Sequence, residues 1–95
     1  MGPNVLSDGF TVRFSSSARR DLTQIPPRYA AAIIEFATVL LPSNPHRLGK
    51  PLRNELMGLH GARRGDYRVL YEIIEADRIV LIIRIDHRGR AYSRR

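Results

Sequence analysis

The sequence predicts an α+β fold in which one small antiparallel sheet carries an N-terminal helical hairpin on one face. Three observations support this prediction: an alternating apolar segment near the N-terminus, two helical patterns separated by a pair of prolines, and a C-terminal half rich in β-branched residues. The element order is then β-α-α-β-β-β, which leaves the other face of the sheet partly open. A chain of 95 residues has room for one domain. We expect residues 10–95 to form it and residues 1–9 to be a flexible tail.

The N-terminal half of the domain is predicted to be a strand followed by two helices. Residues 10–14 alternate apolar and polar side chains, which is typical of a half-buried strand. Serines 15–17 offer N-cap oxygens for a helix over about residues 17–24, which the Pro26–Pro27 pair ends. A second helix is predicted over about residues 27–41. The side chains expected in the core are Phe10, Val12, Phe14, Ala18, Leu22, Ile25, Ala30, Ile33, Ile34, Ala37, Leu40 and Leu41.

The C-terminal half is predicted to form three strands after an irregular connection over residues 46–56. The strands cover about residues 59–64, 66–75 and 78–87, and the turn over residues 75–78 makes the last two an antiparallel hairpin. The last strand is almost continuously apolar. It is therefore either a central strand covered on both faces or a strand lying largely under the helices.

The positive charge is concentrated in two blocks. The net charge is +7, and 15 of the 16 basic residues are arginine. Residues 46–68 hold six basic residues against two acidic ones, and residues 84–95 hold five arginines against one acid. The two blocks flank the last strands and could meet on the uncovered sheet face. Arginine binds phosphate through a planar fork, so this pattern favours nucleic-acid binding over a basic rim kept for solubility or a bias in genomic composition.

Several classes of function have no support in the sequence. There is no cysteine, which fits a cytoplasmic protein and rules out a thiol nucleophile or a cysteine-based metal site. The three histidines are scattered and no carboxylate cluster accompanies them, so we expect neither a metal nor a cofactor. No apolar run is long enough to span a membrane, and residues 1–10 lack the features of a signal peptide.

Two residues of the predicted strands are candidates for chemistry on RNA. Arg68 interrupts an apolar strand, where it either pairs with Glu72 on the same face or binds a phosphate. His87 ends the last strand and is a candidate general acid or base. Which residue of the last strand lies beside Arg68 depends on a turn register that the sequence leaves open. Such side chains suit RNA cleavage without metal, because the 2′-hydroxyl is a nucleophile within the substrate.

Three segments carry a resemblance to a known family. These are GKPLR at residues 49–53, GLHGARRGDYRVLY at residues 58–71 and IDHRGRAY at residues 85–92. Over residues 10–92 the chain resembles RelE-type toxins of the RelE/ParE toxin–antitoxin superfamily. The resemblance implies a RelE-like fold and a ribosome-dependent mRNA interferase that cleaves the codon in the A site of the 30S subunit. It also implies a cognate RelB-like antitoxin, often acidic, in a hetero-oligomeric complex.

The resemblance also implies roles for individual residues. Arg68 corresponds to the arginine that contacts the scissile phosphate, and Arg88 to one that stabilises the transition state or acts on the leaving group. Tyr92 corresponds to a tyrosine that orients the reacting nucleotide, and His87 lies near a histidine with an acid–base role in some members. Further contacts to RNA or the ribosome are implied for Lys50, Arg53, Arg63, Arg64 and Arg90.

The chain departs from the family pattern in the strand before Arg68. Some members carry two lysines there, one of them a proposed base, whereas residues 59–64 contain none. His87 is then the first candidate for the base, and Glu55 and His60 are more distant ones. Two other functions stay open: a toxin of the same fold that inhibits DNA gyrase, and a non-catalytic RNA-binding protein.

Overall fold

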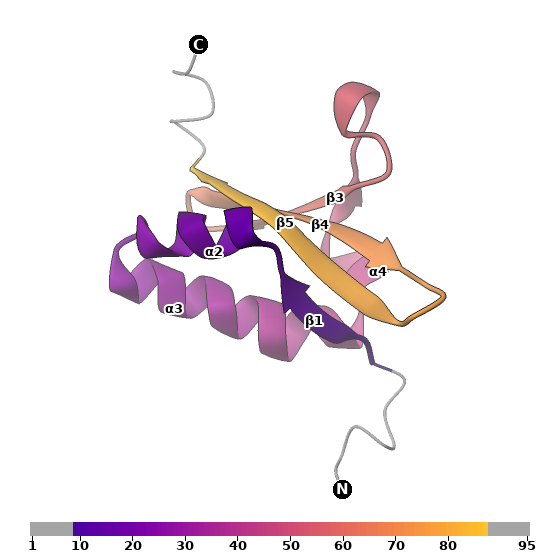
Figure 1. The fold of residues 1–95 in the computed structure, drawn as a ribbon, viewed down its shortest axis with the longest axis horizontal. Helices are drawn as coiled ribbons and strands as arrows, with labels where there is room; N and C mark the ends of the chain where they lie inside the picture. Colours follow the sequence, from indigo (N-terminus) through magenta and orange to yellow (C-terminus); the bar gives the residue numbers. More distant parts are fainter. Residues whose placement is uncertain (1–8, 88–95) are drawn as a thin grey trace, which may run out of the picture.

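The computed structural model describes residues 9–87, which form a mixed five-stranded sheet with a helical hairpin on one face (Figure 1). The strand order is β1-β5-β4-β3-β2. The predicted α+β class and the order of its main elements are confirmed. Residues 1–8 of the tail expected over residues 1–9, and the basic segment after His87, lie outside the described residues. The elements are β1 (Thr11–Phe14), α2 (Ser16–Thr23), α3 (Pro27–Glu35), a π-helical turn (Phe36–Leu40), a 3₁₀ turn (Leu41–Ser43), α4 (Pro45–Leu48), β2 (Lys50–Pro51), a second 3₁₀ turn (Asn54–Leu56), β3 (His60–Arg64), β4 (Tyr67–Ile74) and β5 (Ile79–His87).

One strand differs in direction from the expected antiparallel sheet. β1 pairs parallel with β5, from Thr11 opposite Ile79 to Phe14 opposite Ile82. The pairs β2–β3, β3–β4 and β4–β5 are antiparallel, including the predicted hairpin between the last two strands. A short alternating sequence determines which side chains share a face, but it does not determine the direction of the neighbouring strand. The sheet is therefore mixed.

The second helix changes pitch part-way along. The α-helical hydrogen bonds of α3 give way to a π-helical turn, in which the N–H of Leu41 bonds to the carbonyl of Phe36. A π turn holds more residues than an α turn, so it rotates the residues that follow. The predicted apolar stripe is wrong in two places, because Ile34 and Leu40 are 41% and 44% exposed while Phe36 is buried. Of the two, only Leu40 lies in the π-helical turn.

The connection after this helix contains more structure than the irregular segment predicted from residues 46–56. The short helix α4 and the two-residue strand β2 lie at its start. The buried hydroxyl of Tyr71 donates a 2.6 Å hydrogen bond to the carbonyl of Pro45 and so attaches α4 to β4. Gly49 sits against that hydroxyl so closely that a Cβ atom would collide with it. The glycine is needed for close packing there.

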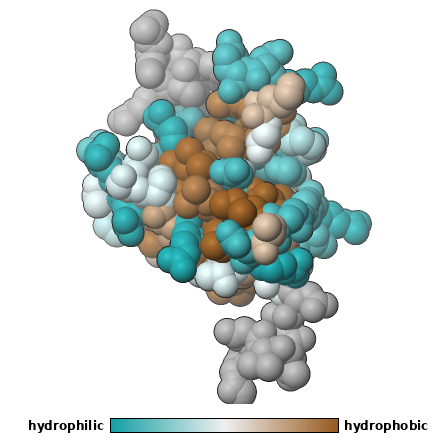
Figure 2. Space-filling view, turned by 45° about the vertical axis from the view of Figure 1, so that its right-hand side comes forward, coloured by the Kyte–Doolittle hydropathy of each residue, from teal (hydrophilic) through white to brown (hydrophobic). Residues whose placement is uncertain are grey.

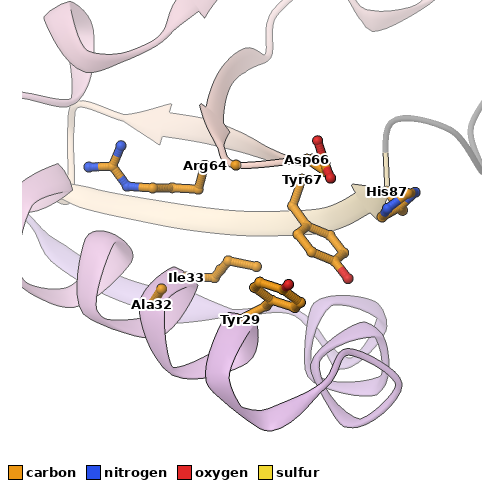
Figure 3. Close-up of a pocket in the computed structure, with 8 residues that line it drawn as sticks. Tyr29, Ala32, Ile33, Arg64, Asp66, Tyr67 and His87 are labelled. Atoms are coloured by element: carbon orange, nitrogen blue, oxygen red, sulfur yellow. The ribbon is translucent and has the colours of Figure 1, made fainter.

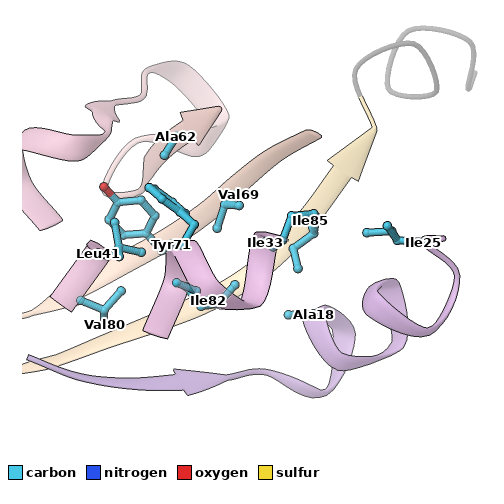
Figure 4. Close-up of a cluster of buried hydrophobic side chains, with 12 residues drawn as sticks. Ala18, Ile25, Ile33, Leu41, Ala62, Val69, Tyr71, Val80, Ile82 and Ile85 are labelled. Atoms are coloured by element: carbon cyan, nitrogen blue, oxygen red, sulfur yellow. The ribbon is translucent and has the colours of Figure 1, made fainter. Parts of the chain in front are cut away.

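The core lies between the sheet and the helical hairpin. It contains Ala18 and Ile33 from the helices and Val69, Tyr71 and Ile82 from the two longest strands (Figure 4). The predicted strand residues of β1 pack against it. β5 is thus a strand lying under the helices, which was one of the two expected environments.

β1 is shorter than β5, and helix α2 takes over where β1 ends. The hydroxyl of Ser15 donates to the carbonyl of Ile83 at 2.7 Å and accepts from the N–H of Ala18 at 3.0 Å. A carboxylate oxygen of Asp21 accepts a 2.9 Å bond from the N–H of Ile85. The edge of β5 extends beyond the end of β1 and has no strand beside it there. Its backbone groups are instead hydrogen-bonded by the side chains of Ser15, which caps α2, and Asp21, which lies within α2.

A β-bulge at Ile83 decides which side chains of β5 face outward. Before the bulge Ile82 pairs with Tyr71, and after it Arg84 pairs with Leu70, so Ile83 is the extra residue. In a regular ladder that kept Ile83 paired with Leu70, Ile85 would lie opposite Arg68, and the polar residues Arg84 and Asp86 would turn under the helices. With the bulge, Ile85 is buried while Arg84 and Asp86 lie on the sheet face away from the helices, called the outer face below.

Candidate nucleic-acid interface

The outer face gathers the basic residues of separate strands. Arg63 of β3 lies opposite Arg68 of β4, and Arg68 lies opposite Asp86 of β5. In the next row Lys50 of β2 lies opposite Gly61, and Arg84 of β5 lies opposite Leu70. The outer face is defined by Arg13, Lys50, Gly61, Arg63, Arg68, Leu70, Glu72, Ile74, Ile79, Leu81, Arg84 and Asp86.

Asp86 is the acidic centre of this arrangement. Its carboxylate lies 3.9 Å from the guanidinium of Arg68 and 3.5 Å from that of Arg84. Arg68 therefore pairs across the sheet with Asp86, and the sequence-based alternative of a Glu72 partner is not the ion pair in the structure. The side chains of Arg68 and Arg84 are 40% and 55% exposed, so both keep donors accessible to a ligand.

The Arg63–Arg68 pair is unfavourable in an isolated protein. Two like charges directly opposite each other on one sheet face destabilise the pairing of the strands. An anion placed between them would remove this repulsion and accept hydrogen bonds from both planar forks. The pair therefore has the charge and the hydrogen-bond donors that a phosphate needs.

The bulge separates two residues that sequence analysis grouped together. His87 pairs with Tyr67, and their rings meet edge to face at 5.0 Å between centroids. Because Tyr67 and Arg68 are consecutive in a strand, His87 lies on the helix side of the sheet and Arg68 lies on the outer face. The structure does not bring them together on one face.

The remaining predicted site residues are distributed as follows. Arg64 also lies on the helix side, where its guanidinium stacks 4.2 Å from the ring centroid of Phe36. Arg53 is exposed in the connection between β2 and β3, next to Glu55 in a 3₁₀ turn. Arg88, Arg90 and Tyr92 lie outside the described residues.

Arg84 and Arg13 are basic residues of the outer face that sequence analysis did not select. Arg84 carried the same signal as Arg68, a charged residue within an apolar strand. Its face could not be deduced because the bulge just before it reverses the alternation. Arg13 is the outward residue of a four-residue strand whose neighbour and direction were both unknown.

A pocket of about 410 Å³ opens on the helix side at the end of the sheet (Figure 3). The turn between β3 and β4 forms one wall, α3 forms another and the end of β5 closes it. Gly65 begins this two-residue turn with φ at 61°, a conformation that glycine adopts without strain. The lining residues are Tyr29, Ala32, Ile33, Arg64, Gly65, Asp66, Tyr67 and His87.

A second aromatic cluster lies at the opposite end of the helix side. The His60 ring stacks on Tyr71 at 5.5 Å and meets His46 edge to face at 6.0 Å, while His46 pairs with Glu75. Burial, and then the charge of His46, lower the pKa of His60. Burial raises the pKa of Tyr71 to about 12. His60, a distant candidate for the catalytic base, is therefore on the other face of the sheet from Arg68.

Two features are absent from the described residues. Within residues 9–87, no group of three or more His, Cys, Asp or Glu side chains is arranged to hold a metal ion. No helix in the same range is long and apolar enough to cross a membrane.

Sequence comparison finds relatives over most of the chain. Residues 12–92 match the family described as "ParE toxin of type II toxin-antitoxin system, parDE". The chain is 53% identical over 85 residues to Toxin RelG of Mycobacterium tuberculosis, covering 90% of this chain and 98% of that protein. It is 52% identical over 83 residues to Toxin RelE of the same organism, covering 87% and 86% of the two chains.

Structure comparison gives the same result. The toxin–antitoxin complex RelBE2 of Mycobacterium tuberculosis contains a chain with a TM-score of 0.81 and 53% identity, covering 85% of this chain and 93% of that one. A mutant of Escherichia coli RelE in the free state has a TM-score of 0.73 at 15% identity, covering 90% and 87%, and so supports the fold alone.

Proposed function

Since the chain belongs to the RelE/ParE family of toxins of type II toxin–antitoxin systems, we propose that this toxin is a ribosome-dependent mRNA endonuclease. It would cleave the codon in the A site of the 30S subunit and so inhibit translation and growth in the cytoplasm. The observation that carries the proposal is the Arg63–Arg68 pair on the outer face, with Arg84 beside it. This is a site for a phosphodiester built from residues of three strands.

The proposed reaction is attack by the ribose 2′-hydroxyl on the adjacent phosphorus, without a metal ion. The 2′-oxygen loses its proton and forms a bond to phosphorus, the bond to the 5′-oxygen breaks, and that oxygen takes up a proton. The products are a 2′,3′-cyclic phosphate and a 5′-hydroxyl. Arg68 and Arg63 would bind the non-bridging oxygens, whose charge grows in the transition state. Arg88 would act beside them and Tyr92 would orient the nucleotide, as the family resemblance implies.

The residue that takes the 2′-hydroxyl proton is left unassigned, because His87, the first candidate from the sequence, lies on the opposite face of the sheet from Arg68. A general base must lie within hydrogen-bond reach of the 2′-hydroxyl, which is next to the phosphate that Arg68 would bind. An RNA strand that passes over the end of the sheet at Gly65 and Asp66 would instead bring a neighbouring nucleotide to His87. The other basic side chains, Lys50, Arg53, Arg64 and Arg90, would contact RNA or the ribosome along this path.

Primer extension on a defined mRNA in a purified translation system tests the proposal. We expect cuts within the A-site codon, no cuts when ribosomes are omitted, and a cleavage rate at least about 10²-fold lower for Arg68→Ala. Arg19→Ala is the matched control, because Arg19 is exposed on α2 and lies off the sheet. Undiminished cleavage by Arg68→Ala would refute the site. Intact mRNA together with loss of supercoiling in a gyrase assay would instead support the gyrase-inhibiting alternative.

We also propose that an acidic antitoxin of RelB type binds the outer face in a hetero-oligomeric complex. Similar chains occur in the toxin–antitoxin complex RelBE2 of Mycobacterium tuberculosis and in the RelE–RelB complex of Pyrococcus horikoshii. The outer face combines its arginines with the partly exposed side chains of Ile74, Ile79 and Leu81. On the face seen in Figure 2, a hydrophobic patch is likewise bordered by hydrophilic side chains. Such a surface suits an amphipathic segment that carries acidic residues.

A further inference from the structure

The pocket at the end of the sheet has walls that suit a planar aromatic ligand. Tyr29 of α3 and Tyr67 of β4 form an adjoining pair on its wall, with ring centroids 5.9 Å apart and a tilt of 44° (Figure 3). The His87 ring meets Tyr67 from the end of β5. A volume of about 410 Å³ is within the range of small-molecule sites.

Tyr29 is not accounted for by the core. It is 43% exposed, and the guanidinium of Arg28 stacks 4.9 Å from its ring centroid. An exposed tyrosine beside a second tyrosine, with a cation on its face, is the arrangement with which proteins stack nucleobases. The aliphatic part of Arg64 lines the pocket while its guanidinium lies over Phe36, so the wall is held in place.

The charges around the pocket favour a nucleotide. Arg64 lines it, Arg28 lies against the ring of Tyr29, and Asp66 of the turn contributes a carboxylate that can accept from the N–H groups of a base. The pocket also adjoins the phosphate site across the sheet. Tyr67 is followed directly by Arg68, and Arg64 is preceded directly by Arg63.

We propose that this pocket binds one nucleobase of the single-stranded RNA whose backbone lies on Arg63 and Arg68. The strand would pass over the Gly65–Asp66 turn and place a base against the wall formed by Tyr29, Tyr67 and His87. This inference rests on the proposed function in taking RNA as the substrate. It adds a base-binding site on the helix side of the sheet, away from the phosphate site.

The test uses nucleoside 5′-monophosphates as probes and NMR of the free toxin as the readout. We expect the four nucleotides to shift resonances of Tyr29, Tyr67 and His87, with purines binding more tightly because their larger rings overlap more of the tyrosines. Ribose 5-phosphate, which lacks a base, should leave these resonances in place. Tyr29→Ala should weaken nucleotide binding about tenfold. Ile34→Ala is its matched control, since Ile34 is 41% exposed on the same helix and outside the pocket.

The outcomes separate this proposal from the nuclease. Absence of nucleotide-induced shifts at millimolar concentration overturns the pocket proposal, even if Arg68→Ala abolishes mRNA cleavage. Shifts that persist in Tyr29→Ala overturn it as well. Base-dependent shifts that Tyr29→Ala removes support the pocket, even if no mRNA is cut. If nucleotides fail to bind and Tyr29→Ala instead weakens binding of an antitoxin, the occupant is a protein side chain and the proposal is wrong.

Discussion

At the scale of single residues, the outer face depends on how Asp86 is shared. One carboxylate lies between two guanidinium groups, and a third arginine stands opposite one of them. A carboxylate there holds the arginines in position, but it also competes with any phosphate. Three arginines and one aspartate give the set Arg63, Arg68, Arg84 and Asp86 a net charge of +2. This excess is what an RNA backbone would contact.

Arg84 should behave as a phosphate contact in binding measurements. For Arg84→Ala, we expect weaker binding of single-stranded RNA to the toxin and a salt dependence shallower by about 0.7 in log K per log salt unit, the value for one contact on a single strand. Fluorescence titrations at several salt concentrations measure this slope. Arg20→Ala, an exposed arginine of α2, should leave the slope unchanged. An unchanged slope for Arg84→Ala would remove this residue from the interface.

At the scale of elements, the junction of β1, α2 and β5 is the most informative. Ser15 caps α2 and also holds the carbonyl of the bulged residue Ile83. One hydroxyl thus stabilises a helix end and the irregularity that turns Arg84 outward. Both effects depend on the direction in which β1 delivers the chain.

Removing this hydroxyl should destabilise the fold measurably. For Ser15→Ala, we expect a decrease of about 1–2 kcal/mol in the free energy of unfolding, because a helix cap and a partly buried hydrogen bond are both lost. Urea unfolding followed by circular dichroism measures the change. Ser17→Ala is the control, because Ser17 is an exposed neighbour in the first turn of α2. Equal effects of the two substitutions would show that the Ser15 contacts contribute nothing specific.

The same junction shows which residues could be placed from the sequence and which could not. Alternation placed Arg68 on a face apart from Tyr67 and Tyr71, and it found the three core residues around β1, because these depend only on local periodicity. It could not place Arg84, Asp86 and His87, because a bulge in an apolar strand leaves no mark in the hydrophobic pattern. It also could not foresee the exposure of Leu40, which lies in the turn where the helical pitch changes.

At the scale of the whole molecule, stability should fall at both ends of the pH range because of one ring stack. The lowered pKa of His60 means that the unfolded chain binds a proton more readily, so its stabilising contribution is present above about pH 6.5 and is lost as the pH falls further. The raised pKa of Tyr71 acts in the opposite direction. Its contribution is present below about pH 10 and is lost as the pH rises toward 12, by about 1.4 kcal/mol per pH unit.

Urea unfolding across the pH range separates the two limbs. We expect His60→Gln to flatten the acid limb and Tyr71→Phe to flatten the alkaline limb, each relative to the unsubstituted protein. His87→Gln and Tyr29→Phe serve as controls, because these residues of the same types lie in the pocket at the other end of the sheet, away from the stack. Limbs of unchanged slope in the first two variants would contradict the burial of this stack.

The extra residue at Ile83 should make β5 unusually tolerant of one change in length. Deleting Ile83 would leave Ile82 opposite Tyr71 and Arg84 opposite Leu70, so the ladder would become regular and the charged side chains would keep their face. Cells that survive expression of this toxin without an antitoxin offer a direct readout. Among survivors with in-frame deletions of one codon, we expect loss of codon 83 to be under-represented relative to losses of codons 68–70 in β4, where every residue is paired. Equal frequencies would mean that the toxin needs the bulge itself.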